Sequence, residues 1–140
     1  MPSEWLRPPT ELLVWALIAH VVADWLLQTD WMAVNKVNLR HPAGYVHAGV
    51  YTLFMLPLFP WSLALFIGAT HLFIDTRRPV HWWMRNVKRM PSTSGSGTEG
   101  PAAGRASAYA KSGFLESAVD QAFHVVILAA AALAAYWLML

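Results

Sequence analysis

Apolar residues fall into four runs along the chain, at about residues 10–29, 43–57, 61–76 and 113–138. None shows the strict alternation of a half-buried strand, and each is long enough for a helix, so the pattern predicts four helices. Pro8, Pro9 and Thr10 precede or open the first run, an arrangement typical of a helix N-terminus. Pro57 and Pro60 separate the second and third runs, which indicates a tight helical hairpin.

Two different segments separate the third and fourth runs. In residues 79–90, tryptophans and Met84 are interleaved with Arg85 and Lys88, which predicts an amphipathic helix at a membrane interface. Residues 91–112 consist mainly of Ser, Gly and Ala and contain few large apolar side chains. A segment with so little to bury is expected to be a flexible loop.

The composition points to an integral membrane protein. Of the 140 residues, 56% are hydrophobic and only 13% are charged, against about a quarter charged in soluble domains. We therefore expect one all-α domain, residues 1–140, that forms a polytopic four-helix membrane bundle. The second and third runs are short enough to be either spanning or re-entrant helices. The absence of cysteine excludes disulfides, thiolate metal ligands and cysteine nucleophiles.

The basic residues predict the orientation. All 10 Lys and Arg residues except Arg7 fall in loops 30–42 and 77–112 or at their edges. Basic residues in short loops are retained on the cytoplasmic side, so both loops should be cytoplasmic and both termini extracytoplasmic. The expected location is a bacterial inner membrane. The lipid bilayer accounts for the basic residues, so we expect no nucleic-acid partner.

Polar side chains inside the apolar runs are the candidates for function, since an uncompensated charge there costs about 3 kcal/mol or more. Those on the same run are mostly four residues apart and so share a helical face. They are His20, Asp24 and Gln28 in the first run, His47 and Tyr51 in the second, His71 and Asp75 in the third, and Asp120, Gln121 and His124 in the fourth.

The ionisable members of this set should converge in the cytoplasmic half of the bundle, at a rise of about 1.5 Å per residue. Imidazole and carboxylate groups are ligands for divalent Zn, Mn or Fe, and a cation removes the repulsion between clustered carboxylates. We expect one or two ions, most plausibly Zn. A proton relay and a metal-free polar network are the alternatives. The candidate ligands are His20, Asp24, His47, His71, Asp75, Asp120 and His124.

Three strings of the sequence carry a resemblance to a known family. These strings are HVVADWLLQTDWMAVNK, THLFIDTRR and VDQAFH, with His47 between the first and the second. Together they resemble domain of unknown function family 3307, a family of small bacterial and phage membrane proteins. The resemblance covers nearly the whole chain apart from residues 91–112. It implies a shared polar signature and names no reaction.

The leading functional hypothesis is a metal-dependent membrane hydrolase. A bound ion would activate water, and a carboxylate of Asp24, Asp75 or Asp120 would act in catalysis. Gln28, Gln121 and Tyr51 are expected to support the ligands or contact the substrate. A lipid or another phosphate-bearing substrate would meet cations at the cytoplasmic mouth. These cations are Lys36, Arg77 and Arg78.

Other functions stay open at this point. Intramembrane acids and histidines also suit a transporter of metal ions or protons, although the outer halves of the first and last runs lack ionisable groups. A transport path would then require a homo-oligomer. A haem-binding bundle would use two of the histidines but leaves the three aspartates unexplained. A non-catalytic interaction or regulatory protein is the remaining alternative.

Overall fold

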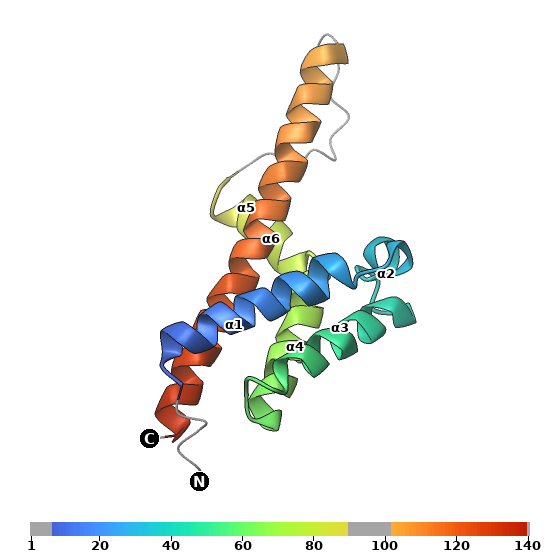
Figure 1. The fold of residues 1–140 in the computed structure, drawn as a ribbon. Coiled ribbons are helices and arrows are strands. Elements are labelled where there is room, and N and C mark those ends of the chain that lie inside the picture. The colour runs from blue at the N-terminus through green and yellow to red at the C-terminus, as the bar shows by residue number, and fades with distance from the viewer. Residues whose placement is uncertain (1–6, 90–101, 140) are drawn as a thin grey trace.

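The computed structural model describes residues 7–89 and 102–139, and every regular element in these ranges is helical (Figure 1). This confirms the all-α prediction. The elements are α1 (Pro9–Val21), η2 (Val22–Leu26), α2 (Asp30–Asn35), α3 (Pro42–Met55), α4 (Trp61–Asp75), α5 (Arg78–Asn86) and α6 (Ala102–Met139).

Local sequence signals explain where several helices begin. Proline occupies the first turn of α1, α3 and α5, where its missing N–H costs no hydrogen bond. Thr29 caps α2 by accepting a hydrogen bond from the Met32 N–H at 3.3 Å. His41 caps α3 in the same way, through Nδ1 and the Ala43 N–H at 3.2 Å. The short helix α2 was not predicted from the sequence.

Helices α3 and α4 form the predicted hairpin, and α1 crosses α6 (Figure 1). The α3–α4 contact is close at Gly68, where an added Cβ would overlap the Thr52 hydroxyl. One half of the bundle is filled almost entirely by apolar side chains. They include Leu12, Ala16, Met55, Phe59, Ala64, Ile67, Leu128, Ala131, Ala132 and Ala135. The buried polar residues lie in the other half, towards the C-terminal ends of α1 and α4.

Helix α5 is amphipathic, as predicted, but part of its apolar face is covered by protein. Val80 and Met84 are buried together with Val119 of α6. The Trp83 and Phe123 rings meet edge to face, with centroids 5.7 Å apart. The apolar face of α5 therefore anchors this helix to α6, while Trp82 remains 60% exposed.

The predicted loop 91–112 needs correction. Helix α6 begins at Ala102, so the second half of that segment is helical, and residues 91–101 lie outside the described residues. The error arose because the segment has little to bury, whereas its many alanines have the highest intrinsic helix propensity. The helix propensity of these alanines favours an extension of α6 back to Ala102.

Among the described residues, two helical segments are long and apolar enough to cross a membrane. They are Pro9–Leu26, with 18 residues, and Gly113–Leu138, with 26 residues. Trp61–Asp75 is apolar but shorter. Two such helices are a weak indication of membrane insertion, and they do not confirm the predicted four-span topology.

Candidate metal centre

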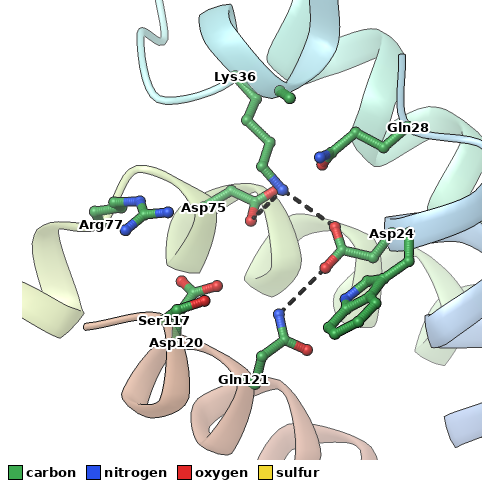
Figure 2. A pocket seen from close by; sticks show the side chains of 10 residues that line it. Asp24, Gln28, Lys36, Asp75, Arg77, Ser117, Asp120 and Gln121 are labelled. Carbon is green, nitrogen blue, oxygen red and sulfur yellow. Dashed lines mark hydrogen bonds and ion pairs between the residues drawn. The ribbon is translucent and has the colours of Figure 1, made fainter. Parts of the chain in front are cut away.

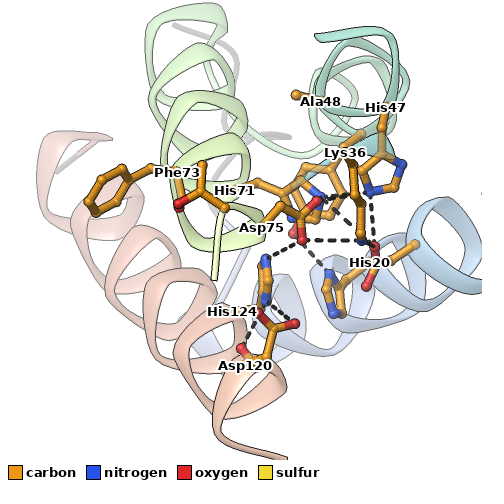
Figure 3. Close-up of polar contacts among 12 residues, drawn as sticks. His20, Lys36, His47, Ala48, His71, Phe73, Asp75, Asp120 and His124 are labelled. Carbon is orange, nitrogen blue, oxygen red and sulfur yellow. Dashed lines mark hydrogen bonds and ion pairs between the residues drawn. The ribbon is translucent and has the colours of Figure 1, made fainter. Parts of the chain in front are cut away.

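Four buried side chains from three elements converge on one point, where all four ligand atoms lie within 4.8 Å of one another. They are His47 of α3 and His71 and Asp75 of α4 (Figure 3), together with Asp24 of η2 (Figure 2). His47 Nε2 lies 2.9 Å from Asp24 Oδ1, 3.0 Å from His71 Nε2 and 3.3 Å from Asp75 Oδ2. We call these four residues the ligand cluster.

The ligand cluster has the dimensions of a tetrahedral metal site. Bonds of about 2.1 Å to nitrogen and oxygen place neighbouring ligand atoms of a tetrahedron about 3.4 Å apart. His71 Nε2 lies 3.2 Å from Asp75 Oδ2 and 3.9 Å from Asp24 Oδ1. With the His47 distances, five of the six edges fall between 2.9 and 3.9 Å. Two nitrogens and two carboxylate oxygens are a donor set suited to Zn, Mn or Fe.

Hydrogen bonding alone does not satisfy the two imidazoles. A neutral imidazole carries one N–H, and His47 Nε2 and His71 Nε2 face each other at 3.0 Å. Nδ1 of each ring is buried without a hydrogen-bond partner in the described part of the chain. With the protons on Nε2, each ring can donate to a carboxylate, His47 to Asp24 Oδ1 at 2.9 Å and His71 to Asp75 Oδ2 at 3.2 Å, and both Nδ1 lone pairs stay unpaired. A cation bound by both Nε2 atoms would instead use these converging atoms as ligands and place the protons on Nδ1.

Lys36 supplies positive charge at the edge of the ligand cluster. Its ammonium group lies 3.1 Å from Asp24 Oδ1 and 3.1 Å from Asp75 Oδ1 (Figure 2). The Lys36 side chain is only 13% exposed. The sequence placed Lys36 among the substrate-binding residues, whereas its direct contacts in the structure are with the two carboxylates.

A chain of hydrogen bonds supports Asp24 from the opposite direction. The Gln121 amide donates to Asp24 Oδ2 at 3.3 Å, and Gln121 Oε1 lies 3.0 Å from His20 Nε2. His20 Nδ1 lies 3.2 Å from the Tyr51 hydroxyl. The Tyr51 ring in turn stacks on His71, with centroids 3.7 Å apart. Supporting contacts of this kind orient metal ligands and tune their basicity.

His20 is therefore placed beside the ligand cluster and not in it. Both of its ring nitrogens have hydrogen-bond partners, so neither is free to bind an ion. Tyr51 contacts His20 and stacks on His71, and Gln121 contacts His20 and Asp24, so both lie next to the ligand cluster. Asp120 and His124 form a separate pair on α6, next to Asp75 (Figure 3).

The local backbone at Asp24 departs from a regular α-helix. Residues Val22–Leu26 form a π-helical turn, a feature that is frequent at functional sites. His20 and Asp24 still lie on the same side of the helix, because both contact Gln121, but the helix ends at Leu26 and the predicted stack does not extend to Gln28. Asp24 reaches the ligand cluster, while Gln28 lies beyond the end of η2.

A polar pocket of about 280 Å³ adjoins the ligand cluster (Figure 2). Its wall includes Gln28, Arg77, Asp120 and other predicted residues, whereas Arg78 is exposed and does not line it. Arg77 has a positive φ of 58°, a conformation that is uncommon for residues other than glycine. Three lining residues were not predicted from the sequence: Trp25, Ala33 and Ser117. Trp25 follows Asp24 directly and Ser117 lies three residues before Asp120, so their closeness to predicted residues was the available signal. Ala33 lies three residues before Lys36 and carries no functional group.

The fold and the site define a small all-helical protein with a buried centre of histidines and carboxylates. Residues 12–140 match the sequence model of one protein family, which is described as "Protein of unknown function (DUF3307)". The chain therefore belongs to this family, and the resemblance noted from the sequence is confirmed. No curated protein and no solved structure matched the chain.

Proposed function

We propose that the protein is a divalent-metal-dependent hydrolase of the bacterial inner membrane. The ligand cluster binds the ion, and the substrate enters through the adjoining polar pocket. The proposal rests on one observation: among the residues that the structure describes, the four converging ligand atoms are accessible from the side of the polar pocket only. Asp24 and Asp75 border the pocket, whereas the other end of the bundle is closed by apolar side chains.

The donor set favours Zn, with Mn or Fe as alternatives. An ion held by two imidazoles and two carboxylates activates water and polarises a carbonyl or phosphoryl oxygen. Asp120 lies outside the ligand cluster and lines the pocket, so it is available as the general base. Asp24 and Asp75 act in catalysis through the ion, and Gln121 keeps Asp24 in position.

With a divalent ion bound, the pocket would suit an anionic group on the substrate. Its wall holds three carboxylates, Asp24, Asp75 and Asp120, and two cationic groups, Lys36 and Arg77, so the ion would supply the excess positive charge. Gln28, Gln121 and Ser117 contribute hydrogen-bonding groups. A phosphate ester, including a phospholipid head group, fits this chemistry. Insertion of Pro9–Leu26 and Gly113–Leu138 in the bilayer, with loops 30–42 and 77–112 in the cytoplasm, would open the pocket towards the cytoplasmic surface.

The haem alternative finds no support in the site. His47 and His71 approach each other to 3.0 Å, with carboxylates at the same point. A macrocycle has no room between them. Transport of metal ions is the alternative that the experiment must separate from hydrolysis.

The test begins with full-length protein purified in detergent and supplied with Zn²⁺. We expect the wild type to retain Zn²⁺ after dialysis and to hydrolyse bis-p-nitrophenyl phosphate. His47→Ala and His71→Ala should lose both properties, whereas His81→Ala, which alters an exposed histidine, should keep them. If no divalent ion is retained, the metal-centre proposal is wrong. Zn²⁺ flux into proteoliposomes without hydrolysis would replace the hydrolase with a transporter.

A further inference from the structure

His124 has the arrangement of a metal-binding histidine, although it lies outside the ligand cluster. Its Nδ1 donates a hydrogen bond to the Asp120 backbone carbonyl at 2.9 Å. This contact fixes the proton on Nδ1 and leaves Nε2 with a free lone pair. Nε2 is buried without a hydrogen-bond partner in the described residues, and the whole residue is only 2% exposed.

The lone pair of His124 faces one oxygen of Asp75. His124 Nε2 lies 3.9 Å from Asp75 Oδ1, a separation that allows both atoms to bind the same ion (Figure 3). Lys36 Nζ lies 3.1 Å from the same oxygen, so an ion bound there would displace the ammonium group from it. The other oxygen, Asp75 Oδ2, faces the ligand cluster at 3.2 Å from His71 and 3.3 Å from His47. The two oxygens of one carboxylate are therefore directed at two different groups of ligands.

We propose that Asp75 bridges two divalent ions, the second of which is bound by Asp75 Oδ1 and His124 Nε2. This inference rests on the proposed function, because the first ion is the one held by the ligand cluster. Two ions bridged by a carboxylate are about 3.5–4 Å apart in hydrolytic enzymes, where they stabilise the attacking and leaving oxygens. The remaining coordination positions of the second ion belong to water or to substrate oxygens. Mn²⁺, Zn²⁺ and Fe²⁺ bind imidazole together with carboxylate, so they suit such a site.

The net charge of the site is consistent with a second divalent ion and with a phosphate-bearing substrate. Asp24, Asp75 and Asp120 carry three negative charges when ionised, and Lys36 carries one positive charge. One divalent ion balances this group with the histidines neutral. A second ion adds two positive charges that the phosphate group of a substrate offsets, so the second ion should bind more tightly when an anion is present.

The experiment counts Mn²⁺ bound to the full-length protein in detergent. We expect two Mn²⁺ per chain in the wild type, and a spin-coupled pair in the electron paramagnetic resonance spectrum. His124→Gln should retain one Mn²⁺ and lose the coupling. His81→Gln is the control, because it makes the same change at an exposed histidine of α5. It should retain two Mn²⁺.

The possible results separate this inference from the proposed function. One Mn²⁺ per wild-type chain, lost in His47→Ala, would overturn the second site and leave the first standing. Two ions in both His124→Gln and His124→Ala would also overturn the second site. No Mn²⁺ and no Zn²⁺ in the wild type would overturn both. Retention of the first ion by His124→Gln shows at the same time that this variant is folded.

Discussion

Replacing Lys36 with methionine should strengthen metal binding. The ammonium group of Lys36 lies 3.1 Å from one oxygen of Asp24 and 3.1 Å from one oxygen of Asp75. The side chains of these aspartates are 5% and 2% exposed, so both carboxylates depend on a nearby cation. In the metal-free protein that cation is Lys36. A divalent ion in the ligand cluster takes over the same role.

The size of the effect follows from the cost of breaking a buried ion pair by removing one partner, which is about 3–5 kcal/mol. In the metal-free protein, the Lys36→Met variant loses this stabilising energy. In the metal-bound protein most of the loss disappears, because the ion would neutralise the two carboxylates. By linkage, the difference appears as tighter metal binding. Since about 1.4 kcal/mol corresponds to a factor of ten, the dissociation constant should fall at least about 100-fold.

The assay is a competition titration of Zn²⁺ between the protein in detergent and a chromogenic chelator. Thermal unfolding with and without excess chelator provides the second readout. Lys36→Met should unfold at a lower temperature than the wild type in chelator and gain more from added Zn²⁺. Arg77→Met is the control, because Arg77 lines the pocket but its ion pair is with Glu116, at 4.0 Å. Equal or weaker Zn²⁺ binding by Lys36→Met would refute the reasoning.

Two further predictions concern packing and topology. Gly68→Ala should destabilise the protein by about 1–3 kcal/mol, because the new Cβ overlaps the Thr52 hydroxyl. Chemical unfolding should show partial recovery when Thr52→Ala is added, and strictly additive losses would argue against this contact. Since the chain has no cysteine, Lys88→Cys and Trp137→Cys each create one labelling site. In intact cells an impermeant maleimide should label the cysteine at 137 and spare the one at 88, and the reverse would invert the proposed orientation.

The sequence predicted the four members of the ligand cluster within a larger set of candidate ligands, but it did not separate them from the rest of that set. Spacing of four residues placed His71 and Asp75 on one helical face, and the structure brings both into the ligand cluster. The same spacing put Asp120 and His124 together on α6. Periodicity gives the face of a helix, but it does not give the rotation of that helix against its neighbours. For this reason His20 and the four cluster members looked equivalent in the sequence.

Lys36 shows a second limit of sequence reasoning. Its contact with Asp24 and Asp75 depends on the turn at Thr29 and on the short helix α2, which return the chain towards the bundle. Helix α2 has only six residues, too few for a clear periodic signal. The π-helical turn at Asp24 is likewise invisible in a hydrophobic pattern, because it changes the register by a single residue.

The distribution of polar groups bears on the choice between hydrolysis and transport. A transporter needs polar groups on both sides of its central site, so that an ion leaving the site meets new ligands. In the described part of the chain, the ligand cluster borders a polar pocket on one side and a core of Leu, Ala, Phe, Met and Ile on the other. An ion would reach this site from the pocket, and among the described residues it would meet no carboxylate or imidazole in the apolar core beyond the site. A centre with one entrance holds its ion and exchanges substrate and product through the same opening, as a hydrolase requires.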